Sequence, residues 1–390
     1  MNNKINSFLF NSEITIFIFF CVFFKADYLS NFPTLNLIFN FLTLSISLMV
    51  YFIYLIYQKF NKIKVDKMDL LISIYFIIIG FSTIINHQDV IYFLFKIIPY
   101  ITIYLYTKLC IYNNPKKYLS VFNKYFIITT LINFISVILT NNRDINRVFF
   151  LGYDNSFTPY IVFGCFIQLI YYIKYYKELS TIEKFNIKIS ILFNISTCLM
   201  VRSASCKIGM ALFVLSYILL KVLKIKNIKI FNYNFFFTFS VLLFLFIVIF
   251  RFQNYFEYII VDLLKRDLTF TGRTYIWDNV MTYIKNNKLF GLGFCDMVIR
   301  MKTIGIYHAH STYLNILFES GISGLIAYNG ILIENGKYIS KNKNLYIKNV
   351  ISFLFFTFFI ICITEVYTQL HIIYLLFALN VYYSNNIKEG

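Results

Sequence analysis

The chain has 390 residues, of which 59% are hydrophobic and 21% aromatic, and its formal net charge is +18. A soluble domain has an apolar share nearer one half, so the composition excludes an ordinary soluble protein and indicates an integral membrane protein. The positive charge then reflects cytoplasmic loops, where Lys and Arg gather in membrane proteins, and it does not indicate a nucleic-acid partner.

Long apolar runs recur along the whole chain. They are about 17 to 25 residues long, the length that a helix needs to cross the hydrocarbon core, and they lack the alternation of a transmembrane barrel. The sequence thus predicts an all-α integral membrane protein with about twelve transmembrane helices and one large extracytoplasmic loop. The expected spans are 8–24, 33–57, 69–86, 90–111, 122–140, 157–173, 187–201, 208–222, 234–250, 311–333, 347–364 and 367–383.

This map divides the chain into three parts. Residues 1–250 hold nine spans, residues 251–310 form the loop subdomain, and residues 311–390 hold the last three spans. The first apolar run lacks a small-residue cleavage site, so we expect a retained span and not a removed signal peptide.

The distribution of positive charge predicts the orientation. Lysines cluster in alternate loops, for example at Lys59, Lys62, Lys64 and Lys67. Lys and Arg in short loops set the orientation, whereas long segments cross largely regardless of charge. We therefore expect a multi-pass protein of the cell (inner or plasma) membrane, with both termini in the cytoplasm and the 251–310 loop outside.

All the arginines fall in segments that this map places outside. They are Arg143, Arg147, Arg202, Arg251, Arg266, Arg273 and Arg300. A guanidinium binds phosphate oxygens with two parallel hydrogen bonds and stays charged when partly buried. The pattern favours an anionic, phosphate-bearing substrate at the outer face; the alternative is chance placement with ordinary surface pairing.

The long loop has an order of its own. Apolar residues over 252–264 keep helical spacing, which is typical of a helix lying in the membrane interface. Thr271 or Gly272 can then cap a second helix, on which Arg273 and Trp277 share a face because they are one turn apart. Trp277 is the only tryptophan, and it suits an interfacial anchor as well as a substrate contact.

The helix that follows the loop carries a polar stripe. Ser311 is a suitable N-cap, and Ser311, Asn315 and Glu319 recur every four residues on one face. A carboxylate inside a membrane faces a cavity or a partner, so we expect a structural or cavity role for Glu319. His308 and His310 precede this helix, but without further ligands nearby they do not predict a metal site.

In their order and spacing these elements resemble the O-antigen ligase and polysaccharide-polymerase family, membrane enzymes of bacterial surface-glycan assembly. The matching positions are Gly272, Arg273 and Trp277, then Gly291 and Gly293 in a predicted turn, then His310, Ser311, Leu314, Glu319, Gly321 and Gly324. A family Ser-Arg/Lys-x-Gly element is similar to SASCKIG, with Lys207 in place, Cys206 where serine is usual, and Arg202 as the competing candidate. A family asparagine matches Asn155.

The resemblance implies a GT-C-like glycosyltransferase that inverts configuration and needs neither a metal nor another cofactor. Its donor would be a saccharide on undecaprenyl diphosphate. His310 would act as the base on the acceptor hydroxyl, and the substrate-binding residues would be Arg273, Lys207, Arg202, Trp277 and Asn155. The implied partners are lipid-linked oligosaccharides, membrane lipid, and proteins of the flippase and chain-length-regulator kind, with no nucleic acid.

The leading functional hypothesis is a repeat-unit polymerase of capsule, O-antigen or exopolysaccharide synthesis. One alternative is the ligase of the same family, which moves finished polymer onto a lipid A core; others are a flippase for lipid-linked oligosaccharides and a membrane scaffold. A flippase is disfavoured by the lack of repeat symmetry and by the scarcity of ionisable residues within spans. A transferase that uses nucleotide sugars is disfavoured because no Walker A or D-x-D element stands in a suitable place.

Overall fold

The computed structural model describes residues 12–60, 63–140, 148–222, 232–263, 267–270, 272–367 and 370–385. These residues form helices and no sheet, so the all-α prediction is confirmed. The α-helices are α2 (Glu13–Phe23), α3 (Pro33–Lys59), α4 (Lys67–Ile85), α5 (Val90–Asn113), α6 (Pro115–Leu139), α7 (Asp154–Lys174), α8 (Thr181–Met200), α9 (Ala204–Tyr217), α10 (Tyr233–Phe244), α11 (Arg273–Asn286), α12 (Met297–Ile304), α13 (Thr312–Lys341), α14 (Leu345–Cys362) and α15 (His371–Asn385).

Within the described ranges, seven helices are long and apolar enough to cross a membrane: α3, α4, α5, α6, α7, α13 and α14. Four shorter apolar segments, built on α2, α9, α10 and α15, coincide with further predicted spans. Helix α8 overlaps the remaining predicted span, 187–201. Its apolar stretch is shortened by Glu183, Lys184 and Lys188 in its first half. Every predicted span thus overlaps a helix, while a total of twelve complete crossings stays a prediction.

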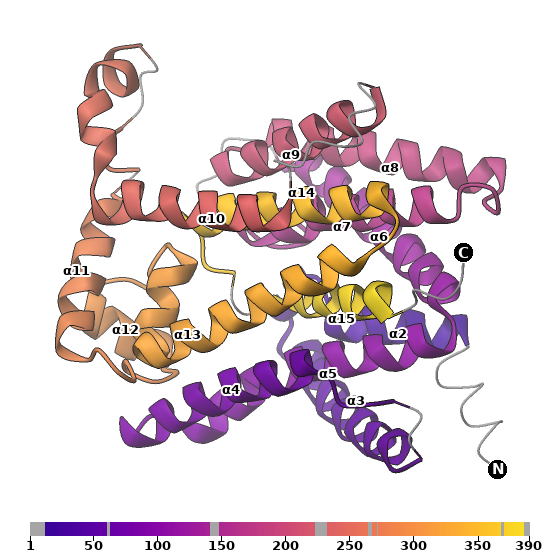
Figure 1. Cartoon of the computed structure of the whole chain (residues 1–390), viewed down its shortest axis with the longest axis horizontal. Coiled ribbons are helices and arrows are strands. Elements are labelled where there is room, and N and C mark those ends of the chain that lie inside the picture. The colour runs from indigo at the N-terminus through magenta and orange to yellow at the C-terminus, as the bar shows by residue number, and fades with distance from the viewer. Residues whose placement is uncertain are drawn as a thin grey trace.

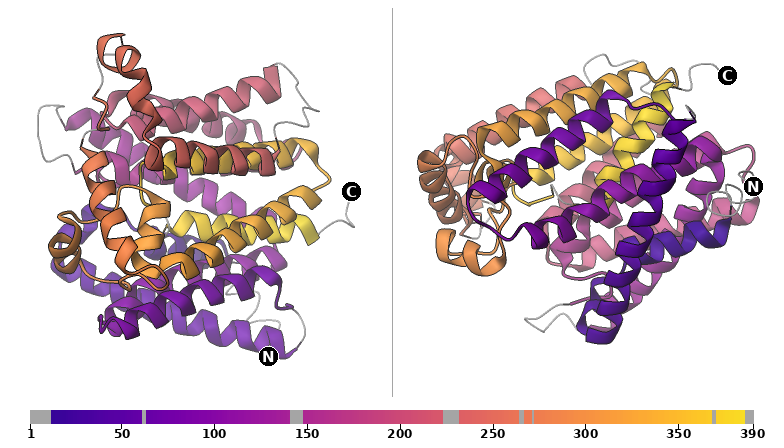
Figure 2. Two further views of the ribbon diagram at one scale, coloured as in Figure 1. Left: turned by 60° about the vertical axis from the view of Figure 1, so that its left-hand side comes forward. Right: turned by 90° about the horizontal axis from the view of Figure 1, so that it is seen from below.

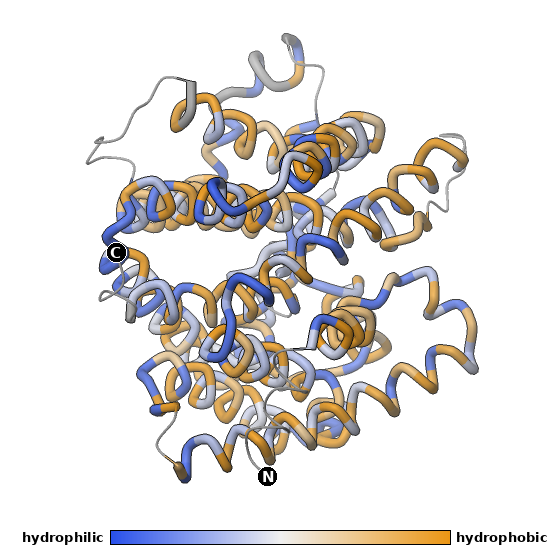
Figure 3. Tube along the Cα trace, turned by 90° about the vertical axis from the view of Figure 1, so that its right-hand side faces the viewer, coloured by the Kyte–Doolittle hydropathy of each residue, from blue (hydrophilic) through white to orange (hydrophobic). Residues whose placement is uncertain are grey.

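The long helices run side by side, and α11 and α12 pack across one end of the bundle (Figures 1 and 2). Helix α13 lies along α4 and α15, and α10 packs on α14. Hydrophobic residues prevail along the helices (Figure 3). On α3, Leu37, Phe41 and Leu48 are 70%, 68% and 72% exposed, which suits a lipid-facing surface because contiguous apolar patches of this kind are rare in water. The chain is an integral membrane protein.

Connections that the charge pattern places on one side of the membrane meet at one end of the bundle. The Asn86 side-chain amide donates to the Gly291 carbonyl oxygen at 3.1 Å, which joins the α4–α5 turn to the long loop. At the other end, the Lys116 ammonium lies 2.5 Å from a Glu178 carboxylate oxygen and joins two loops expected in the cytoplasm. Which end faces the cytoplasm stays a prediction from the charge pattern.

Helix α13 is interrupted at Gly321, whose φ of 63° and ψ of −160° lie outside the helical region. This backbone conformation is essentially restricted to glycine. A Cβ atom at this position would lie 2.3 Å from the Leu289 carbonyl oxygen, so the end of the long loop packs directly against the break. The continuous span predicted over 311–333 therefore consists of two helical halves.

Residues 288–294 fill this break and satisfy its backbone groups. The Leu292 N–H donates to the Phe318 carbonyl at 2.7 Å, and the Gly293 N–H donates to the Glu319 carbonyl at 2.9 Å. Each unpaired backbone group would cost several kcal/mol in a bilayer, so the loop makes the broken helix possible at membrane depth. The predicted glycine turn is present, with φ angles of 64° and 84° at its two glycines.

The interfacial helix predicted over 252–264 is formed only in part. Phe252–Phe256 is a short 3₁₀ turn, Tyr258–Leu263 is a π-helical turn, and Leu264 lies outside the described residues. The apolar spacing predicted one continuous helix, whereas Arg251 with its positive φ of 54° starts the chain in a new direction just after the α10 segment.

The second predicted helix of the loop is confirmed as α11. It begins at Arg273, and its N-cap is Gly272 in the left-handed conformation, with φ of 81°. The alternative cap, Thr271, lies outside the described residues.

Candidate active site

Arg273 and Trp277 lie one turn apart on α11, as predicted, and each contacts a different part of the site. Arg273 Nη2 donates to Glu365 Oε1 at 2.6 Å. Trp277 is fully buried, and its Nε1–H donates to the His310 carbonyl oxygen at 3.2 Å. The face of α11 thus fixes a guanidinium and the histidine-bearing segment next to each other.

His310 is held in an unusual backbone conformation. Its φ of 45° is in the left-handed region, which costs on the order of 1–3 kcal/mol for a residue with a side chain. Its ring centroid lies 4.1 Å from that of His308. Among the described residues, the buried Nδ1 atoms of His308 and His310 have no hydrogen-bond partner. Two adjacent unsatisfied ring nitrogens are unusual in a protein interior, and they leave two positions where substrate groups can bind.

The surroundings keep both histidines neutral. Burial lowers the pKa of His310 to about 3, and the neighbouring His308 and Arg273 act in the same direction. Burial also lowers the pKa of His308, with the positive charges of Arg300 and Arg273 as further causes. A neutral imidazole can accept a proton, so this pair meets the first requirement of a general base.

Glu365 is a site residue that the sequence did not predict. It lies in the short connection between α14 and α15 and is only 4% exposed. Burial raises the pKa of Glu365, while Arg273 opposes this shift. The Thr312 hydroxyl donates to the Glu365 carbonyl oxygen at 2.8 Å and accepts the Tyr367 N–H at 3.0 Å. The same connection therefore orients Arg273 and fixes the start of α13, directly after His310.

Asn155 links the starts of α7 and α9. Its Oδ1 accepts hydrogen bonds from the hydroxyls of Ser203 at 2.6 Å and Ser205 at 3.3 Å. Its carbonyl oxygen accepts the Tyr367 hydroxyl at 2.9 Å. A side-chain hydrogen bond from Ser205 also lowers the pKa of Glu365, against the effect of burial. Asn155 thus belongs to the same polar network as Arg273.

Lys207 and Arg202 are placed differently. Lys207 is in the first turn of α9, Arg202 lies just before that helix, and both residues are exposed. Neither side chain lines the cavity described below. Their substrate-binding roles stay predictions.

Two other arginines of the expected outer side have structural partners. Arg300 is 8% exposed, donates from Nη2 to Glu319 Oε1 at 2.5 Å and from Nη1 to Asn315 Oδ1 at 3.0 Å. The polar stripe of α13 therefore binds a buried arginine, in agreement with the structural role expected for Glu319. Arg251 donates to Asp278 at 2.7 Å. Arg143, Arg147 and Arg266 lie outside the described residues.

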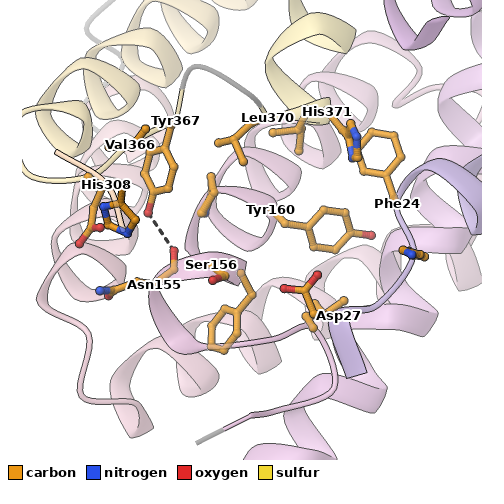
Figure 4. A pocket seen from close by; sticks show the side chains of 16 residues that line it. Phe24, Asp27, Asn155, Ser156, Tyr160, His308, Val366, Tyr367, Leu370 and His371 are labelled. Carbon is orange, nitrogen blue, oxygen red and sulfur yellow. Dashed lines mark hydrogen bonds between the residues drawn. The ribbon is translucent and has the colours of Figure 1, made fainter. Parts of the chain in front are cut away.

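A cavity of about 420 Å³ opens beside the network (Figure 4). Its size is in the range of small-molecule sites. Its walls come from residues 24, 25 and 27, from residues 151, 155–157, 159 and 160, and from residues 365–367 and 370–372, and His308 is the contribution of the long loop. Arg273 and His310 are not part of the lining, and their neighbours Glu365 and His308 connect them to it.

A family model described as O-antigen ligase matches residues 190–328. Residues 190–328 form an O-antigen ligase family domain. Enzymes of this family, which serve polysaccharide synthesis, transfer lipid-linked glycans. A comparison with curated proteins gave no match.

The O-antigen ligase family domain runs from α8 into the second half of α13, and five of the predicted site residues lie within it: Arg202, Lys207, Arg273, Trp277 and His310. Asn155 and Glu365 are outside the matched segment, yet each is hydrogen-bonded to a residue inside it. Most of the cavity wall also lies outside the domain. The site therefore needs the flanking helices as well as the matched segment.

Proposed function

We propose that the protein is a polysaccharide repeat-unit polymerase. It would transfer a glycan from undecaprenyl diphosphate onto a lipid-linked repeat unit at the outer face of the membrane. The observation that carries this proposal is the shared face of α11, which holds Arg273 on Glu365 and Trp277 on the His310 carbonyl. A group suited to an anionic leaving group and a group suited to an acceptor proton are thereby positioned side by side.

In the proposed reaction, the acceptor hydroxyl oxygen attacks the anomeric carbon of the donor glycan. The new glycosidic C–O bond forms as the bond between that carbon and the diphosphate oxygen breaks, with inversion at carbon. His310 takes the hydroxyl proton, and undecaprenyl diphosphate leaves with the electron pair. Arg273 stabilises the negative charge that develops on this leaving group. No nucleotide sugar takes part.

Glu365 would balance the positive charge of Arg273 before the donor binds. In the structure its carboxylate neutralises the guanidinium at 2.6 Å. A diphosphate carries more negative charge and more acceptor oxygens than one carboxylate, so it can replace part of this pair through the free edge of the guanidinium fork. Glu365 then keeps the fork oriented, which makes it a positioning residue.

The other predicted residues would act around this centre. Asn155 reaches the cavity and would contact the glycan. Lys207 and Arg202 would attract the diphosphate to the N-terminal end of α9. Trp277 is buried under the histidine segment, so its contribution would be to hold His310 in place. Twelve crossings, with the 251–310 loop outside, would place the site at the extracytoplasmic surface.

The experiment that tests this function is a gel profile of lipid-linked and surface glycan in cells that lack this gene. The cells are re-supplied with the native protein, Arg273→Ala, His310→Ala, or Lys285→Ala as a control that removes an exposed cation from the last turn of α11. We expect single repeat units in the null and in the first two variants, and long polymer with the native protein and the control.

Two other patterns would contradict the polymerase. Long polymer that forms in the null but stays on its carrier lipid would indicate the ligase of the same family. Loss of every outward-facing glycan species in the null would indicate a flippase. Full polymer with His310→Ala would remove His310 from the catalytic role.

A further inference from the structure

The cavity has a second end, remote from the histidine pair, that the reaction centre does not use. Figure 4 shows His308, Asn155 and Tyr367 at one end and Phe24, Asp27 and His371 at the other, with Tyr160 between them. We propose that this second end is a saccharide subsite that binds a sugar residue of the acceptor glycan. The proposal rests on the proposed function and names residues outside the O-antigen ligase family domain.

The carboxylate of Asp27 lies at this second end of the cavity (Figure 4). It lines the cavity, the residue is exposed, and it interacts electrostatically with the Lys25 ammonium. The fold makes room for it: a Cβ atom at Gly152, whose φ is +108°, would lie 2.3 Å from Asp27 Oδ2. The Tyr28 N–H donates to the Phe150 carbonyl at 3.3 Å and joins the two loops at this point. An accessible carboxylate beside an ammonium is an acceptor that suits the hydroxyls of a sugar.

The rings of Phe24, Tyr160 and His371 line the same cavity as this carboxylate (Figure 4). Ring centroids of Phe24 and Tyr160 are 6.0 Å apart, and those of Phe24 and His371 are 5.7 Å apart. The Tyr160 hydroxyl is hydrogen-bonded to the Thr129 hydroxyl at 2.8 Å, which fixes the orientation of its ring. A sugar ring has apolar C–H faces and polar edges, so fixed rings beside a carboxylate match both of its surfaces.

Lys25 adds donors at the same end. Its ammonium donates to the Asn36 side-chain oxygen at 2.7 Å. An ammonium has three N–H groups, so it can hold Asn36 and also reach a ligand oxygen. A carboxylate acceptor and an ammonium donor side by side offer both kinds of hydrogen bond that a sugar hydroxyl makes.

The position of the cavity assigns this subsite to the acceptor. The lining includes a neighbour of each reactive residue, His308 beside His310 and Glu365 beside Arg273. The Glu365 carboxylate lies between the cavity and Arg273 and would repel a donor diphosphate from the cavity. In the proposed reaction the histidine takes the proton of the acceptor hydroxyl, whereas the arginine holds the donor diphosphate. The sugar that fills the cavity is therefore the one that carries the attacking hydroxyl.

The test uses the full chain in proteoliposomes. The donor is the lipid-linked repeat unit extracted from cells that lack this gene, and the acceptor is the oligosaccharide that mild acid releases from it. The apparent KM for this soluble acceptor is compared among the native protein, Asp27→Asn, Tyr160→Ala and the control Asp262→Asn, which makes the same charge change at an exposed site. Fluorescence of the buried Trp277 checks that each variant is folded.

Hydrogen bonds to charged groups contribute about 1.5–3 kcal/mol, so Asp27→Asn is expected to raise the acceptor KM roughly tenfold or more. The donor KM and the rate at saturating acceptor should change little, and Asp262→Asn should behave like the native protein. An unchanged acceptor KM in a folded Asp27→Asn protein, or an equal rise in donor KM, overturns the subsite. If the native protein does not consume the donor, the proposed function fails instead.

Discussion

Arg273 Nη2 and Glu365 Oε1 lie 2.6 Å apart although 92 positions separate the two residues in the chain. The contact joins the first residue of α11 to the connection between α14 and α15. Through this contact the long loop is attached to the helix bundle beside the cavity. In the proposed function the contact also determines where the guanidinium binds the donor diphosphate.

Replacing Glu365 should impair catalysis by misplacing Arg273. Misplacement by about 1 Å can cost on the order of 10²-fold in rate, so we expect a loss of that size in Glu365→Ala. Glu365→Gln keeps an oxygen that accepts the same N–H bond, and it should retain activity within about tenfold of the native rate. Initial rates of donor consumption measure both, with Glu178→Gln at the other end of the bundle as the control. Equal losses in both Glu365 variants would contradict a positioning role.

The pH dependence of kcat/KM should show how strongly His310 is perturbed. His310 must be neutral to accept a proton, and its pKa in the free protein is lowered to about 3. Because protonation removes the active form only as the pH falls through that value, kcat/KM should stay level between about pH 5 and 7. A bound diphosphate adds negative charge beside His310 and raises its pKa, so the acid limb of kcat should lie at higher pH than that of kcat/KM. A fall in kcat/KM centred near the ordinary histidine pKa would contradict this environment.

The break in α13 should depend on Gly321. Gly321→Ala places a Cβ atom 2.3 Å from the Leu289 carbonyl oxygen and forces alanine into a glycine-only conformation, so we expect a loss of about 3 kcal/mol or more. Gly330→Ala, in the regular part of the same helix, meets Leu71 at an ordinary 3.4 Å and should be neutral or slightly stabilising. Thermal unfolding in detergent compares the two. Equal melting temperatures would mean that residues 288–294 do not clamp the break.

The Arg300–Glu319 pair should contribute to stability only as a pair. Removing one partner leaves a buried charge, so Arg300→Met or Glu319→Leu alone should cost about 3–5 kcal/mol, and the double replacement should recover most of this loss. Lys116→Met is the control, because Lys116 and its partner Glu178 are 43% and 54% exposed and such a pair contributes about 1 kcal/mol or less. Melting temperatures of the four proteins provide the measurement. A double variant no more stable than either single variant would assign Arg300 a role beyond this pair.

Local features of the chain were predictable from the sequence. Span length located the helices, and the three-residue gap between Arg273 and Trp277 predicted their shared face because a helical turn has a fixed pitch. The glycine turn and the position of Ser311 as the N-cap of α13 were predictable for the same reason, although the buried Ser311 hydroxyl accepts no hydrogen bond from α13 in the described structure.

Contacts between distant segments were not predictable in this way. Glu365 finds Arg273 across 92 positions, and a single sequence contains no periodicity that reports such a pair. Its one signal is a carboxylate at the edge of two apolar runs, where an ionisable residue is costly and needs a partner. The break at Gly321 was missed because glycine also occurs within regular membrane helices. The backbone N–H groups that satisfy the break come from residues 288–294, which lie outside the span.

Polymerisation is tested most directly by incubating the purified protein with lipid-linked repeat unit in proteoliposomes, without nucleotide sugars. We expect a ladder of longer lipid-linked glycans and release of one undecaprenyl diphosphate for each bond formed, both lost in Arg273→Ala. Unchanged repeat unit, or repeat unit that only crosses the bilayer, would contradict it.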